Sequence, residues 1–152
     1  VISAEALRTH FEQHYADYIN RLHKLIKDTK YKNDGLTTII LNTKRVKGTD
    51  ANQEVKIAHN ANQAWNHVFF FNCLMSPSYQ EPSSWLLNRI IMSFGSYHNF
   101  QSEFKRKAIE LFGSGWVWLV LGKDSKLEII ASKNSYFCFR CLGARLLFEL
   151  CK

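Results

Sequence analysis

Three side chains that can bind a metal or carry a proton lie at four-residue steps near the start of the chain: His10, His14 and Tyr18. In an α-helix, residues four apart lie on nearly the same face, and here the apolar residues of the segment occupy that face too. We therefore expect all three side chains to point inward, toward the element that packs on this helix.

A second stripe of the same kind follows later in the chain. His59, Gln63 and His67 are again four residues apart, and aromatic side chains surround them, namely Trp65, Phe69, Phe70 and Phe71. Two such helices packed face to face would bring imidazoles together inside an aromatic box. Neutral imidazole is a good ligand for first-row transition metals, and facing helices can build such sites. The two stripes therefore predict a metal site between two helices.

Less specific interpretations of these residue types stay open at this point. A histidine on an apolar helix face is more often a hydrogen-bonded core residue than a metal ligand. Cys138 and Cys141 have the spacing of half a zinc site, but no second pair lies at a suitable distance. The basic stretch 44–47 lacks the interleaved aromatic residues that stack on bases, so a solvated loop explains it most simply.

The composition is that of a folded domain with an anion-attracting surface. Of 152 residues, 46% are hydrophobic and 14% aromatic, which excludes a disordered chain. The formal net charge is +7, which would attract nucleic acid, acidic lipid or a small anion. No apolar run is long enough to span a membrane, and the four cysteines form no spaced disulfide framework. We expect an intracellular location, without distinguishing mitochondrion, plastid and cytoplasm.

The first half of the sequence predicts a helical hairpin. Ser3 is a suitable N-cap for a long first helix, whose apolar residues recur at three- and four-residue steps as far as Ile26. A polar connector with one short apolar helix over 36–41 follows. A second long helix is predicted over about 51–74, where two prolines then stop it.

The second half changes from helical to strand periodicity. Helical patterns cover 85–92 and 97–112, with Ser96 as the N-cap of the second. Two β-rich runs, 116–121 and 127–131, flank a polar turn, which is typical of a β-hairpin. Helices followed by strands predict an α+β fold.

Several segments together resemble the iron/manganese superoxide dismutase family in order and spacing. Besides the HxxxHxxxY stripe, these are the run 62–70 with its WNH motif and the run 112–120, FGSGWVWLV. Shorter matches at 2–5, 81–82 and 93–96 accompany them. The WNH and FGSGWxWL motifs are specific, and their combination leaves little room for chance. The resemblance covers about residues 2–134.

The resemblance implies superoxide as the substrate and iron as the cofactor, with manganese less favoured. His10 and His67 would be two of the metal ligands. Tyr18 would be the gateway tyrosine, and His14 the histidine behind the ligands. Gln63 occupies the position from which iron-type members send an amide toward the metal-bound solvent, where manganese-type members usually carry Gly.

Two further residues would form the wall of the site by the same resemblance. Trp116 matches an aromatic residue that lines the metal site in the family. Phe71 stands where many members have Trp, a departure that makes the wall smaller. The fold implied is an N-terminal antiparallel helical hairpin followed by an incomplete α/β domain with helices and a β-hairpin.

The resemblance also implies a C-terminal DxWEHAYY motif, which these residues lack. In the family this motif supplies the remaining Asp and His ligands and a Glu that bridges the homodimer. The expected domains are a helical hairpin over 1–78, a partial α/β domain over 79–134 and a non-homologous, apolar, Cys-rich tail over 135–152. We accordingly expect a superoxide dismutase with impaired activity, weakly held metal and a weakened homodimer.

One alternative is a non-catalytic descendant of this fold, such as the superoxide-dismutase-like, RNA-binding proteins of mitochondrial ribosomes. The basic charge would suit such a protein. A protein without a metal site would not be expected, however, to carry histidines at metal-site spacing, so we do not expect nucleic acid as the partner. Because no apolar run could span a membrane, we do not expect a membrane partner either.

Overall fold

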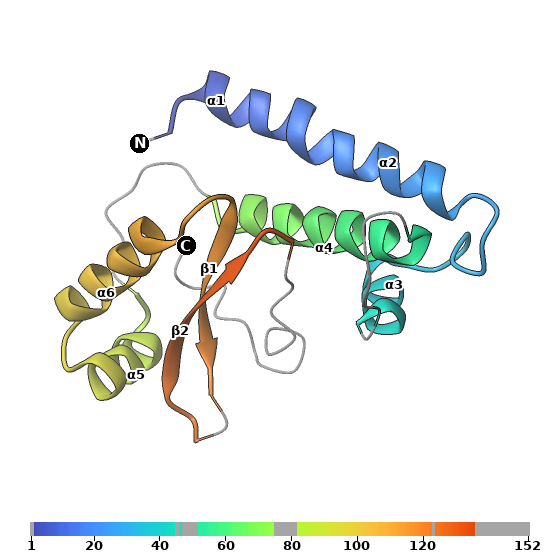
Figure 1. The fold of residues 1–152 in the computed structure, drawn as a ribbon. Coiled ribbons are helices and arrows are strands. Elements are labelled where there is room, and N and C mark those ends of the chain that lie inside the picture. The colour runs from blue at the N-terminus through green and yellow to red at the C-terminus, as the bar shows by residue number, and fades with distance from the viewer. Residues whose placement is uncertain (1, 45, 47–51, 75–81, 123, 136–152) are drawn as a thin grey trace. The chain divides into compact units, whose positions relative to one another are not determined.

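The computed structural model describes residues 2–44, 46, 52–74, 82–122 and 124–135. The chain divides into two compact units, Val1–Phe71 and Asn72–Lys152. Figure 1 shows the helices of the first unit and the helices and β-hairpin of the second. The α+β fold class predicted from the sequence is confirmed.

The first helix of the hairpin changes its winding half-way. It begins as α1 (Ala4–Thr9), continues as a π-helical segment, η1 (His10–Tyr15), and ends as α2 (Ala16–Ile26). The hydroxyl of Ser3 accepts a hydrogen bond from the Ala6 N–H at 3.1 Å, which confirms the predicted N-cap. A regular α-helix was expected throughout, and the wider i→i+5 turn of η1 is a departure from it.

Two more helices complete the described part of the first unit. The short α3 (Leu36–Thr43) and the long α4 (Gln53–Asn72) follow as predicted. The side-chain amide of Gln53 donates to the Leu25 carbonyl at 2.9 Å, which joins the start of α4 to the end of α2. The two long helices are therefore antiparallel. Their buried core, which α3 and the α2–α3 connector also supply, consists of Leu22, Ile26, Tyr31, Ile39, Ile40, Ile57, Ala61 and Ala64.

The second unit combines two helices with a β-hairpin. Helices α5 (Ser84–Phe94) and α6 (Tyr97–Glu110) precede strands β1 (Gly115–Leu121) and β2 (Leu127–Lys133). The strands pair antiparallel from Gly115 opposite Lys133 to Leu121 opposite Leu127. Helices and hairpin share one buried cluster, made of Leu86, Ile90, Phe100, Leu119 and Leu127.

The connection between α5 and α6 is set by two local features. Gly95 has a positive φ of 81°, and its N–H donates to the Ile91 carbonyl at 2.8 Å, which ends α5. The hydroxyl of Ser96 accepts from the Asn99 N–H at 3.0 Å, which starts α6 and confirms the predicted cap. Two adjacent residues, Gly95 and Ser96, therefore determine the turn between the helices.

One predicted domain boundary and most of the predicted tail lie outside the described residues. The boundary at 78/79 falls within residues 75–81, and the predicted tail, Ser135 excepted, also lies outside the described residues. Both stay predictions. Among the described helices, none has the length and apolar character needed to cross a membrane.

Candidate metal centre

Two histidines from different helical segments meet inside the first unit. The ring centroids of His10, in η1, and His67, on α4, lie 4.9 Å apart with an angle of 80° between the rings. A metal–imidazole bond is about 2 Å long, so rings at this separation can each direct a nitrogen to one ion. The geometry therefore allows a shared metal, the arrangement that the two stripes predicted.

The ring of His67 is held in one orientation. Only 4% of the residue is exposed, and its Nδ1 lies 2.7 Å from the carbonyl oxygen of Gln63, one turn earlier on α4. Because a carbonyl can only accept, Nδ1 carries the proton, and the lone pair is on Nε2. A hydrogen bond from the other ring nitrogen is the usual way in which proteins orient a ligating histidine.

Aromatic rings surround this pair. Phe70 and Phe71 lie 5.3 and 5.5 Å from the ring of His10, and Phe71 is also 6.4 Å from that of His67. On the other helix, Tyr15 stacks near His67 at 6.3 Å. The predicted wall residue Phe71 is thus beside both histidines, and the rings around the pair are mostly aromatic.

Phe70 belongs to the aromatic box predicted from the sequence, whereas Tyr15 was not singled out as a site residue. Phe70 follows His67 by three residues, a helical spacing that makes the two side chains neighbours on α4. Tyr15 follows His10 by five residues, which in an α-helix would place it on another face. The π turn of η1 brings residues five apart together, and the sequence carries no signal for such a turn. Short π segments often occur at functional sites.

The remaining predicted site residues are distributed as follows. Tyr18, on α2, is half-buried with its ring 5.3 Å from that of His67, and Gln63 is buried on α4. His14 lies 5.7 Å from His10 but is exposed. The side chain of His14 is thus not buried as the helical stripe predicted, although it stays close to His10. Trp116 belongs to the second unit, 5.9 Å from Trp118, and its place in the wall stays a prediction.

The surroundings favour the neutral form of both imidazoles. Burial lowers the pKa of His10 below 6.5, and neighbouring His14 lowers it further. Burial is also the main cause that lowers the pKa of His67. The hydrogen bond to the Gln63 carbonyl opposes it, and the charges of His10 and His14 add to it. Both rings are thus neutral at pH 7, as a metal ligand must be.

A pH dependence of stability follows from the lowered pKa of His67. Between the lowered pKa of His67 in the folded chain and the value of 6.5 in the unfolded chain, the unfolded chain binds more protons than the folded chain. The free energy of unfolding therefore rises with pH across this range. In the metal-free chain we expect this contribution to be complete above pH 6.5 and to decrease as the pH falls below it. Urea denaturation at a series of pH values measures the effect.

A variant isolates the contribution of this histidine from that of the carboxylates. His67→Gln should show a shallower fall in stability between about pH 7 and about pH 5 than the unmodified chain. Equal slopes in the two proteins would contradict the assignment of the pH dependence to His67.

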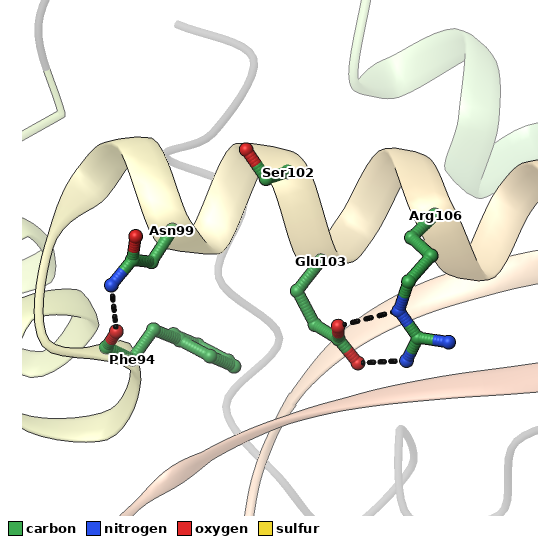
Figure 2. A pocket seen from close by; sticks show the side chains of 5 residues that line it. All are labelled: Phe94, Asn99, Ser102, Glu103 and Arg106. Atoms are coloured by element: carbon green, nitrogen blue, oxygen red, sulfur yellow. Dashed lines mark hydrogen bonds and ion pairs between the residues drawn. The ribbon is translucent and has the colours of Figure 1, made fainter.

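The second unit has a hollow of a different character. Figure 2 shows its lining residues, Phe94, Asn99, Ser102, Glu103 and Arg106, around a volume of about 370 Å³. Its charged groups are already paired, because Arg106 binds Glu103 at 2.6 Å and Glu110 at 2.5 Å. The histidine pair of the first unit is therefore the stronger candidate for chemistry.

Both halves of the chain match family models. Residues 1–75 match the α-hairpin domain of iron/manganese superoxide dismutases, and residues 82–142 match the C-terminal domain of the same proteins. The chain belongs to the iron/manganese superoxide dismutase family. Every residue of the histidine pair and its aromatic surroundings lies in the α-hairpin match.

Named relatives of this superoxide dismutase family are similar over most of the chain. The chain is 39% identical to "Superoxide dismutase [Fe]" of Salmonella typhimurium and 37% identical to that of Escherichia coli, each over 134 residues. It is 40% identical to the protein of the same name from Entamoeba histolytica. These matches cover 88% of the chain but 64 or 65% of each relative, so the chain spans somewhat under two thirds of their length.

Among the described residues, the histidine pair does not belong to a larger cluster of metal-binding side chains. No three His, Cys, Asp or Glu side chains among the described residues converge on a position that could hold one metal ion. Imidazole nitrogen suits iron, so the two histidines fit the metal as far as they go. The half zinc site considered at Cys138 and Cys141 lies outside the described residues.

Proposed function

We propose that this chain acts on superoxide as an iron-dependent dismutase, with His10 and His67 as two of the iron ligands. The observation that carries the proposal is the approach of the two rings to 4.9 Å within aromatic surroundings. Relatives named "Superoxide dismutase [Fe]" support iron in preference to manganese.

Iron, when bound, would supply one-electron exchange between its ferric and ferrous states. The protein's task is to hold the ion, to orient the ligating side chains and to exclude water. The Gln63 carbonyl keeps the proton of His67 on Nδ1, so that Nε2 is the nitrogen that would hold the ion. The rings of Phe70 and Phe71 limit the entry of water beside His10.

Dismutation converts two superoxide ions and two protons into dioxygen and hydrogen peroxide, so protons must reach the site. Tyr18, with its ring 5.3 Å from that of His67, is our candidate for the residue that guides substrate and protons. Gln63, 7% exposed, is our candidate for the polar group that tunes the reduction potential of the iron. His14, with its ring 5.7 Å from that of His10, is our candidate for a residue that holds this ligand in place. The net charge of +7 favours the approach of an anion.

The number of protein ligands sets how strongly the polypeptide of residues 1–152 should hold iron. Two imidazoles without a third protein ligand hold an ion weakly. We expect this polypeptide to purify with less than one iron per chain and to show dismutation far below that of a fully loaded enzyme. Iron analysis and a superoxide-consumption assay measure the two quantities, with a His10→Ala/His67→Ala double variant as the control.

Three outcomes of this experiment are informative. Iron content and activity that are low but above the double variant support the proposal. A full complement of iron with high turnover would contradict weak binding and would call for ligands elsewhere in the chain. Iron content and activity equal to those of the double variant would refute the proposed function of this polypeptide.

We also propose that the chain forms a weak homodimer. The exposure of His14 beside His10 supports an interface at this end of the hairpin, because it leaves the imidazole accessible to a second chain. Sedimentation velocity over a concentration series tests this, and a monomer at every concentration would contradict it.

A further inference from the structure

The ring of Tyr18 lies between two imidazoles of α4. Its centroid is 5.3 Å from that of His67 and 6.0 Å from that of His59, with ring angles of 43° and 58°. Both separations are in the range of aromatic pairs that contribute to packing. Tyr18 and His59 are each half-buried, so these contacts form within the hairpin.

The spacing along α4 explains the arrangement. His59 and His67 are eight residues apart and so share a face of the helix, separated by about 12 Å along its axis. Tyr18, which comes from the antiparallel α2, enters between them. A metal bond of about 2 Å is too short for an ion at His67 to reach His59 as well. His59 therefore contacts the tyrosine and not the candidate metal position.

We propose that His59 is a positioning residue that fixes the Tyr18 phenol beside His67. This inference rests on the proposed function for its consequence, since a fixed phenol matters only if protons and superoxide pass there. Packed side chains hold one another in place through many weak contacts. With His59 on one side and His67 on the other, the ring of Tyr18 is confined. Without His59, the ring can move away from His67 along α4.

Nuclear Overhauser effects between ring protons test this placement in the metal-free polypeptide of residues 1–152. In the unmodified protein, Tyr18 should show cross-peaks to both His59 and His67. In His59→Ala, the Tyr18–His67 cross-peak should fall more than about two-fold, because the ring gains freedom when a packed neighbour is removed. In His59→Phe, which restores a ring of similar size, the cross-peak should be retained. His23→Ala, at an exposed histidine of α2, is the matched control.

The readout separates positioning from general stability. Circular dichroism should show equal helix content in the variants. An unchanged Tyr18–His67 cross-peak in folded His59→Ala would overturn the proposal, as would the absence of a Tyr18–His59 cross-peak in the unmodified protein, a measurement that needs no variant. Because none of these signals requires iron, a failed dismutase assay with the expected cross-peaks would refute the proposed function and leave the positioning role standing.

Discussion

Replacing His67 by Ala is expected to lower the affinity of the chain for iron by at least about a hundred-fold. Even residues that only orient a metal ligand typically cost about 10- to 100-fold in affinity when they are replaced, and His67 is proposed as a ligand itself. The substitution removes a neutral imidazole whose Nδ1–H is fixed by the Gln63 carbonyl, so that Nε2 is the nitrogen that would bind iron. Competition with a chelator of known affinity, under anaerobic conditions, measures the change.

A matched variant controls for non-specific binding by imidazole. His23→Ala removes an exposed histidine of α2 and should leave the iron affinity within about two-fold of that of the unmodified chain, since surface substitutions have small effects. Equal losses in the two variants would show that iron binds histidines indiscriminately and would contradict a site at His67.

Replacing Leu86 by Ala is expected to destabilise the second unit by about 2–5 kcal/mol. Leu86 is 0% exposed and packs in one cluster with Ile90, Phe100 and residues of both strands. Removing its methyl groups loses their transfer free energy and leaves a cavity, and costs of this size are typical for buried leucines. A loss of this size is a large part of the total stability of a small domain. Urea denaturation of the full chain, followed by the fluorescence of its tryptophans, measures the change.

An exposed aliphatic residue of the same unit provides the comparison. Ile109, on α6, is 72% exposed, and Ile109→Ala should change the free energy of unfolding by less than about 0.5 kcal/mol. If Leu86→Ala and Ile109→Ala have equal effects, the cluster around Leu86 is not the core of the unit.

The fold followed closely from local signals in the sequence. Ser3 and Ser96 form the predicted caps, and the β-hairpin forms around the predicted polar turn. These features depend on a few neighbouring residues, so a single sequence suffices to predict them. The i, i+4 spacing also predicted that His10 and Tyr18 would lie close to His67 of the other long helix.

The site was only partly predictable, and the π segment explains why. Helical periodicity assigns His10 and His14 to one face and Tyr15 to another. Within η1, His14 is exposed and the ring of Tyr15 lies 6.3 Å from that of His67. Nothing in the residue types of this segment marks the change of winding. The role of His59 was similarly hidden, because its contact with Tyr18 depends on the register of two helices distant in sequence.

The central claim is that His10 and His67 hold one and the same iron ion. Nuclear magnetic resonance of the chain with ¹⁵N-labelled histidine rings, during stepwise addition of ferrous iron, tests it most directly. A bound paramagnetic ion broadens the signals of the rings that hold it. We predict that the His10 and His67 signals broaden together while those of the exposed His23 and His98 persist, and that His67→Ala abolishes the broadening of His10. Broadening of one ring without the other, or of His10 unchanged in His67→Ala, would contradict a shared ion.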